Sequence, residues 1–165
     1  MAAGSPFLDD DGHLAVDVHV PLRWKDMDAY GHVNNIQVVQ LMEEARVAAF
    51  GVPAGSGGDA EAEPAPLDLT AGAGEGVRAF VSEHHVKYRA QMKYRVKPVR
   101  VRVSIDAVKG ASVHVGYRMH DGVDGQLLVT ATSVMVYVDA ETGRPVRLTQ
   151  EQKRALQGEG LAPPP

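Results

Sequence analysis

The sequence predicts an α+β domain in which a five-stranded antiparallel sheet wraps around one long central helix. Two observations lead to this prediction. Apolar and polar residues alternate along segments such as 99–106 and 112–119, which is the pattern of strands with one buried face. Residues 36–49 place apolar side chains around most of a helical circumference, which requires burial on several sides. A sheet that curls around this helix would provide that burial.

The N-terminal residues 1–12 are small, acidic and glycine-containing, and we expect a disordered lead-in there. The domain is expected over residues 13–157. Its first strand begins near Leu14 and alternates in period two, which should bring Trp24 into the core. The chain then enters a polar turn and the central helix.

The segment after the helix is rich in Gly, Ala, Pro and acidic residues. Gly51 and Pro53 are expected to end the helix, and residues 54–76 are predicted to form a flexible loop with at most a short helical turn over 64–70. Such a composition lacks the large apolar side chains that pack a core.

Four strands are expected from Val77 onward, joined by short turns into an antiparallel meander. Thr149 and Gln152 form a capping-box pattern that predicts a short helix ending near Gly158, and residues 158–165 are expected to be a tail. Strands that are apolar on both faces suggest that a second copy covers the outer face, so a homodimer or homotetramer is expected.

The overall composition narrows the function classes. A chain of 165 residues predicts one domain, and its net charge of −4 does not favour binding to nucleic acid or to an anionic membrane surface. The absence of cysteine excludes disulfides, thiolate catalysis and cysteine zinc sites. No apolar run approaches the roughly 20 residues that span a bilayer, and the start of the chain does not resemble a signal peptide. We therefore expect a soluble cytoplasmic protein.

The turn before the helix concentrates the polar residues that carry chemistry. It holds two carboxylates, a glycine, a histidine and two asparagines: Asp26, Asp28, Gly31, His32, Asn34 and Asn35. A carboxylate just before a helix lies beside backbone N–H groups that have no partner within the helix and can bind a developing negative charge. Asn34 is the expected N-cap, with Gln37 completing a capping box.

These residues also resemble a known family. The run WKDMDAYGHVNN over 24–35, followed by MEEAR over 42–46, resembles the W-x-D-x-D-x-x-G-H-V-N-N and F-E-E-A-R signatures of hotdog-fold acyl-CoA thioesterases of the 4-hydroxybenzoyl-CoA thioesterase type. The resemblance covers about residues 13–157. It implies hydrolysis of acyl-CoA thioesters at a site between two subunits, and no cofactor.

The resemblance also implies roles for individual residues. Asp28 would be the catalytic carboxylate, acting as nucleophile or general base. Gly31 would allow close backbone approach to the thioester, and N–H groups around Asn34 and Asn35 would hold its oxygen. His32 is a further catalytic candidate, although a role in shaping the turn is also open. Asp26 is expected to be structural and to bond the turn backbone.

Two other functions remain open from the sequence. A hotdog dehydratase or hydratase would pair His32 with Glu43 or Glu44, although ion pairs of these glutamates with Arg46 or a neighbouring strand are the favoured interpretation. The third possibility is a non-catalytic acyl-CoA binding module. The acyl group, the choice between coenzyme A and acyl carrier protein, and the role of Asp28 as nucleophile or base are not determined by residue types.

Seven of the 17 basic residues lie close together with no acidic residue among them: Lys87, Arg89, Lys93, Arg95, Lys97, Arg100 and Arg102. The phosphates of coenzyme A would explain this cluster, and we expect Lys87, Arg89, Lys93 and Arg95 to bind substrate. A charged strand edge that discourages aggregation is the alternative explanation.

Overall fold

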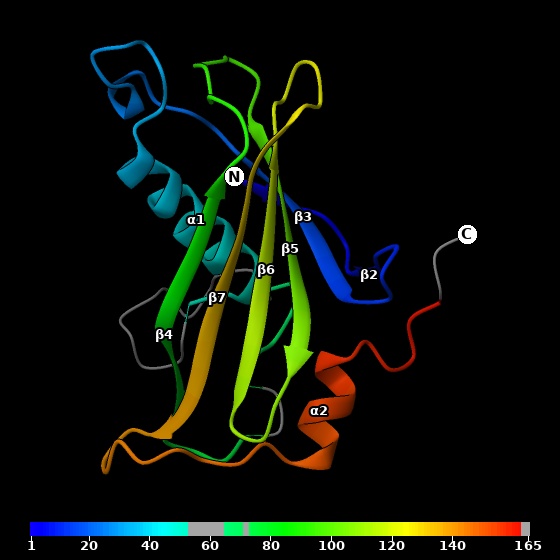
Figure 1. Ribbon diagram of the computed structural model, residues 1–165. Helices are drawn as coiled ribbons and strands as arrows, with labels where there is room; N and C mark the ends of the chain where they lie inside the picture. The colour runs from blue at the N-terminus through cyan, green and yellow to red at the C-terminus, as the bar shows by residue number, and fades with distance from the viewer. Residues whose placement is uncertain (53–64, 71–72, 163–165) are drawn as a thin grey trace.

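A computed structural model of the chain describes residues 1–52, 65–70 and 73–162. These residues form one antiparallel sheet, two α-helices and a short 3₁₀ helix (Figure 1). The long strands are β3 (Leu14–Val20), β4 (Val77–Tyr88), β5 (Val99–Val108), β6 (Ser112–His120) and β7 (Leu127–Asp139). The helices are η1 (Trp24–Asp26), α1 (Asn35–Phe50) and α2 (Gln150–Leu156). None of the described helices is long and apolar enough to cross a membrane.

The order of the strands differs from the predicted meander. The sheet runs β1-β3-β5-β6-β7-β4, so β4 pairs with β7 at one edge and does not pair with its sequence neighbour β5. Only β5, β6 and β7 form a meander. The connection from β4 to β5 instead pairs with the turn before α1, where the Val33 N–H donates to the Met92 carbonyl at 2.8 Å. The crossover therefore brings residues near 90 beside residues near 30.

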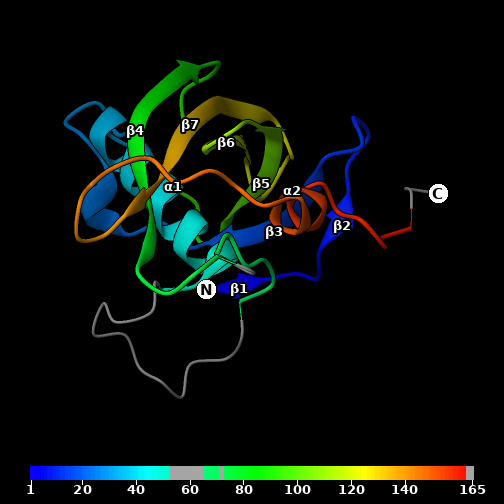
Figure 2. The same cartoon turned by 90° about the horizontal axis from the view of Figure 1, so that it is seen from below.

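The sheet curls around α1, as the end-on view in Figure 2 shows. One side of the helix is buried against the sheet, through Val38, Leu41, Met42, Ala45 and Ala49. Facing them are buried side chains from alternate positions of the strands, including Val101 and Val103 of β5, Tyr117 and Met119 of β6, and Val129 and Tyr137 of β7. The predicted pairing of a curled sheet with a central helix is confirmed.

The opposite side of α1 is open in the single chain. Ile36 is 75% exposed and Val47 is 41% exposed, so the predicted burial on several sides is wrong for this side. Among the described residues, the sheet therefore covers only part of the circumference of the helix. Apolar side chains that stay in water on the uncovered side favour a further partner surface.

The outer face of the sheet is mixed. On β7 it carries Val134, Val136 and Val138, in agreement with the predicted two-sided apolar strand, whereas β3 and β5 place ion-paired side chains on it. Asp17 of β3 accepts hydrogen bonds from Arg102 Nε at 2.8 Å and Arg100 Nη1 at 3.4 Å. Burial acts to raise the pKa of Asp17, but the hydrogen bonds and charges of Arg102 and Arg100 outweigh burial and lower it. Arg102 also lies over the Phe7 ring at 4.8 Å.

The N-terminal residues are ordered on this outer edge, so the predicted disorder over residues 1–12 is wrong. Two short strands, β1 (Ala2–Ala3) and β2 (Phe7–Leu8), pair with β3 and raise the sheet to seven strands. Short strands of two residues carry no detectable alternation, which is why the sequence pattern missed them.

Two other predictions for core residues need correction. Trp24 lies in η1 and is 74% exposed, because the chain leaves the sheet after Val20, before the alternation reaches the tryptophan. Within the expected loop over 54–76, Leu67 and Leu69 are buried in the core, although residues 65–70 form turns and no helix. The remainder of that expected loop lies largely outside the described residues.

The C-terminal helix forms as predicted. Thr149 Oγ1 accepts from the Gln152 N–H at 3.1 Å, and Gln152 Oε1 accepts from the Thr149 N–H at 2.8 Å. The reciprocal bonds of this capping box fix the start of α2. Leu156 is buried, which anchors the helix on the rest of the domain near β5, as Figure 1 shows.

Candidate active site

Asp28 lies in a tight turn that its own carboxylate helps to hold. Its Oδ1 accepts from the backbone N–H groups of Tyr30 at 2.8 Å and His32 at 3.2 Å. The Asp28 N–H donates to the His32 carbonyl at 2.7 Å, which closes the turn. Oδ2 has no hydrogen-bond partner among the residues that the structure describes. One oxygen therefore shapes the turn while the other remains available.

Asp26 stands behind this turn as a structural residue, as predicted. Its carboxylate is fully buried and accepts from the Arg23 N–H at 2.8 Å and from Arg23 Nε at 3.1 Å. Its backbone carbonyl accepts from the Asn34 N–H at 2.9 Å. Asp26 thus ties the end of η1 to the start of α1.

Gly31 and His32 complete the turn. Gly31 has φ +77°, which disfavours any residue with a Cβ, and a Cβ placed there would meet no atom within 4 Å. The glycine is therefore explained by backbone conformation. His32 is half-buried, and its backbone pairs with Lys93 in an isolated bridge. These contacts place the backbone of His32 in the turn, and the role of its side chain stays a prediction.

The first two backbone N–H groups at the start of α1 differ in their hydrogen bonding. Asn34 Oδ1 caps the helix by accepting from the Ile36 N–H at 2.9 Å, although Gln37 does not complete the expected capping box. The Asn34 N–H already donates to the Asp26 carbonyl at 2.9 Å, so its contacts do not support the prediction that it holds a thioester oxygen. The Asn35 N–H has no partner within the described part of the chain.

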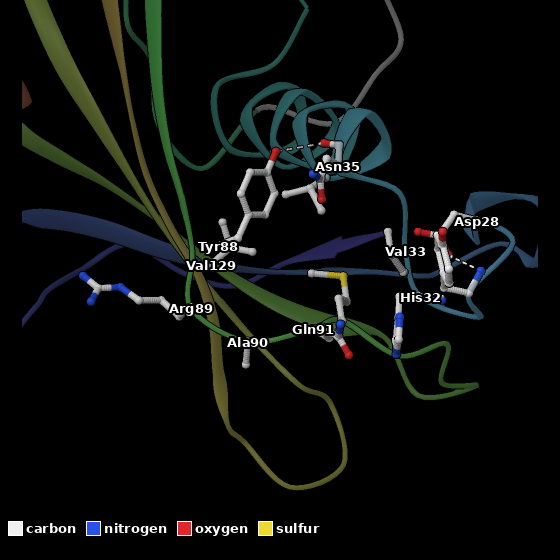
Figure 3. Close-up of a pocket in the computed structure, with 12 residues that line it drawn as sticks. Asp28, His32, Val33, Asn35, Tyr88, Arg89, Ala90, Gln91 and Val129 are labelled. Carbon is white, nitrogen blue, oxygen red and sulfur yellow. Dashed lines mark hydrogen bonds between the residues drawn. The ribbon is translucent and has the colours of Figure 1, made fainter.

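Asp28 and Asn35 line the same cavity, which has a volume of about 450 Å³ (Figure 3). The cavity opens between the turn, the start of α1 and the end of β4. Its apolar part comes from Val33, Val38, Met92 and Val129, all of which are buried. Its polar part includes His32, Tyr88 and Gln91. The site therefore combines an apolar floor with a carboxylate and a helix N-terminus, within the volume range of small-molecule pockets.

Comparison with known proteins supports the family. The model of the thioesterase-like superfamily matches residues 22–156, which include the turn, the central helix and all four later strands. The chain belongs to this superfamily.

Relatives of this thioesterase-like chain match it over most of their own length. The Bacillus subtilis protein YsmA is 26% identical over 137 residues, covering 83% of this chain and 82% of the relative. The Escherichia coli probable thioesterase YbaW has 20% identity and a TM-score of 0.66, covering 86% of this chain and 96% of that one. A Thermus thermophilus thioesterase in complex with coenzyme A and Zn has 24% identity and a TM-score of 0.60, covering 87% and 95%. The last two similarities show a common fold.

The basic residues of this thioesterase-like domain are divided between positions at or near the cavity and structural positions. Arg89 lines the cavity and its Nε lies 3.2 Å from Thr130 Oγ1, and its side chain extends away from Asp28 in Figure 3. Lys87 and Lys93 are exposed nearby on either side of it. Arg95 instead donates to Asp121, a buried carboxylate, at 3.2 Å.

The contact of Arg95 with Asp121 indicates a structural role for this arginine. Burial acts to raise the pKa of Asp121, but the N–H of Val123 and the Arg95 side chain outweigh burial and lower it. A guanidinium that compensates a buried carboxylate is committed to the fold. The expectation that Arg95 binds substrate is therefore not supported by its contacts.

The two glutamates of α1 do not reach this cavity. Glu43 is largely exposed and pairs with Arg46 at 3.5 Å, and neither Glu43 nor Glu44 lines the cavity. Asn35 precedes Glu43 by eight residues, which places them about 12 Å apart along the helix axis. His32 and these glutamates are thus separated, which disfavours the dehydratase alternative.

Tyr88 is the residue of the site that sequence reasoning missed. Its hydroxyl donates to the Asn35 carbonyl at 3.1 Å, which joins the end of β4 to the first residue of α1 (Figure 3). Tyr88 shares a strand face with Val86, two residues earlier, so alternation could have placed it toward the helix. Gln91 and Met92 enter the site through the crossover connection, which has no sequence signal of its own.

A separate group of possible cation ligands lies at the N-terminal edge. Asp9, Asp11 and His13 bring ligand atoms within 4.8 Å of one another. Arg118 approaches both carboxylates, at 3.8 Å from Asp9 and 3.3 Å from Asp11, and therefore already offsets their charge. None of these residues lines the cavity.

Proposed function

We propose that this protein hydrolyses acyl-CoA thioesters in the cavity beside the start of α1. The observation that carries the proposal is that Asp28 and Asn35 line one cavity, each with a polar group that has no partner among the described residues: the Asp28 Oδ2 and the Asn35 N–H. A carboxylate and an anion-stabilising N–H group are the two elements that cleavage of an activated ester requires.

In the proposed reaction the thioester carbonyl oxygen accepts a hydrogen bond from the Asn35 N–H. The positive end of the α1 dipole stabilises the negative charge that develops on this oxygen. Asp28 Oδ2 either removes a proton from the attacking water or attacks the carbonyl carbon itself. In both routes the C–S bond breaks, the thiolate leaves and takes up a proton, and water supplies the second oxygen of the acid.

The apolar floor of the cavity suits the acyl group. Val33, Val38, Met92 and Val129 would surround its hydrocarbon part and exclude water from it. The Asp28 carboxylate is placed at the polar end of the same cavity. This division into an apolar floor and a polar rim supports a thioester substrate with an apolar acyl group.

Coenzyme A is the proposed carrier because basic side chains flank the opening. Arg89 lines the cavity and Lys93 is exposed beside it, and a Thermus thermophilus thioesterase with the same fold binds coenzyme A. We expect replacement of Arg89 and Lys93 by Gln to raise the KM for an acyl-CoA about 10-fold with little change in kcat, because charge-assisted contacts to phosphate are lost. Steady-state kinetics measures both constants.

The control for this prediction is a thioester without phosphates. The N-acetylcysteamine thioester of the same acid should react equally well with the wild type and the double variant. Lys109→Gln removes an exposed charge on the β5–β6 turn and should leave both substrates unaffected. An unchanged KM for the acyl-CoA in the double variant would contradict the assignment of these residues to the carrier.

A homodimer, alone or within a tetramer, is proposed as the working unit. The β4 edge has no strand partner among the described residues, and apolar side chains are exposed on β4 and at the start of α1, with Phe80 at 58% and Ile36 at 75%. Pairing of two β4 edges would extend the sheet and cover them. Sedimentation equilibrium should give at least twice the chain mass of 17.7 kDa, whereas a single-chain mass would contradict the proposal.

The function itself is tested by thiol release from a panel of short, long and aromatic acyl-CoAs. The chain contains no cysteine, so a thiol reagent records only the released carrier. Release from at least one member supports thioester hydrolysis, and the preferred member defines the acyl pocket. If no member reacts but acyl-CoA binds, the protein is a binding module and the proposed function fails.

A further inference from the structure

Tyr88 connects the edge strand to the first residue of the central helix. Its hydroxyl donates to the Asn35 carbonyl at 3.1 Å, across 53 residues of sequence. A carbonyl oxygen can accept two hydrogen bonds, so this bond coexists with the helical bond that the same oxygen accepts. In Figure 3 the phenol ring of Tyr88 spans the distance from β4 to α1 along one wall of the cavity.

The start of α1 has few other attachments on this side. Asn35 and Ile36 are both exposed, and the first buried side chain of the helix is Val38. Among the described residues, the Tyr88 bond is the one hydrogen bond that joins α1 to β4. Without it, the first helical turn would be held by the Asn34 cap and by the bonds of Asn34 and Val33 that precede the helix, none of which involves β4. Helix ends with few contacts fray.

Orientation of this turn matters because Asn35 carries the free N–H group. A rotation of the Asn35 peptide units would move that donor relative to the Asp28 carboxylate on the other side of the cavity. Displacements of about 1 Å in a catalytic group can reduce rates by about 100-fold. Tyr88 therefore holds the same residue, Asn35, that carries the anion-binding N–H group.

We propose that Tyr88 is a positioning residue that aligns the Asn35 N–H with the thioester oxygen in the transition state. The inference rests on the proposed thioester hydrolysis. Tyr88 acts through Asn35 and takes no part in proton transfer or bond breaking. Its effect is expected on the chemical step, because the oxyanion interaction is strongest in the transition state.

The test compares Tyr88→Phe with the wild type and with Tyr94→Phe. Tyr88→Phe keeps the ring and removes only the hydroxyl, so the fold and the cavity wall should be retained. Tyr94 packs edge-on against Trp24 and does not line the cavity, which makes Tyr94→Phe a matched loss of one phenol elsewhere. We expect Tyr88→Phe to lower kcat about 10-fold with KM changed less than about twofold, and Tyr94→Phe to match the wild type.

A second measurement does not depend on activity. The Tyr88 hydroxyl donates to the carbonyl of the Asn35–Ile36 peptide bond. The chemical shift of the Ile36 amide nitrogen therefore depends on whether this hydrogen bond is present. Tyr88→Phe should shift the Ile36 amide and its neighbours in the first turn, whereas Tyr94→Phe should not. A fall in melting temperature with an unchanged kcat would indicate a purely structural role and overturn the proposal.

The two measurements separate the positioning role from the function on which it rests. If the wild type releases no thiol from any acyl-CoA, the proposed function fails and the catalytic role of Tyr88 fails with it. If the wild type is active but Tyr88→Phe retains its kcat, or if the Ile36 amide does not shift, the positioning role alone is wrong. A lower kcat together with the Ile36 shift supports it.

Discussion

Replacing Asp28 by Asn is expected to lower kcat for acyl-CoA hydrolysis by about 1,000-fold, which corresponds to about 4 kcal/mol of lost transition-state stabilisation. The amide has the same shape as the carboxylate, and its oxygen can still accept from the N–H groups of Tyr30 and His32. It lacks the charge and basicity of Oδ2, so it can neither attack the carbonyl nor remove a proton from water. Thiol release measured at saturating substrate gives the change in kcat.

The matched control is Glu43→Gln, which also exchanges a carboxylate for an amide. Glu43 is exposed, pairs only with Arg46 among the described residues, and lies outside the cavity, so this variant should keep wild-type activity. The dehydratase alternative predicts the reverse order of effects. Retention of more than about a tenth of the wild-type kcat in Asp28→Asn would contradict a direct chemical role for this carboxylate.

Replacing Asn35 by Pro is expected to lower kcat by about 100-fold, or about 2.7 kcal/mol, because it deletes the N–H group proposed to stabilise the oxyanion. Proline is tolerated at the first position of a helix, where the N–H has no helical partner. The preceding residue must be extended, and Asn34 has φ −62° and ψ 142°, which meets that requirement. The backbone can therefore accept proline while the donor is lost.

The control for this prediction is Asn35→Ala, which removes the side chain and keeps the N–H. It should retain kcat within about threefold, because an exposed side chain contributes little to the fold or to the proposed oxyanion contact. Circular dichroism verifies that the proline variant keeps its helix. Equal losses in Asn35→Ala and Asn35→Pro would assign the effect to the side chain and contradict the oxyanion role of the backbone.

Much of the fold could be predicted because local patterns record which side chains face inward. The alternation in β5 and β6 placed Val101, Val103, Tyr117 and Met119 correctly in the core. Alternation does not record which strand is the neighbour, so the position of β4 beside β7 was missed. The two short N-terminal strands were missed for a different reason. Contacts with residues distant in the sequence, such as that between Phe7 and Arg102, hold β2 in place, and local patterns do not record them.

The candidate site likewise contains residues that could be predicted from the sequence and residues that could not. The turn residues Asp28, Gly31 and His32 and the helix residue Asn35 are close together in sequence, and the structure brings Asp28, His32 and Asn35 around one cavity. Tyr88 comes from a strand 53 residues away, and only the tertiary fold brings it to Asn35. Residue type also does not reveal which donors are already used, as the Asn34 N–H illustrates by donating to Asp26.

The most direct test of the proposed hydrolysis is to quantify both products from the best acyl-CoA of the panel. We predict that the wild type releases free thiol and free carboxylic acid in equal amounts, and that Asp28→Asn releases both about 1,000-fold more slowly. Consumption of substrate without thiol release, or equal release by wild type and Asp28→Asn, would contradict the proposal that this cavity cleaves thioesters through Asp28.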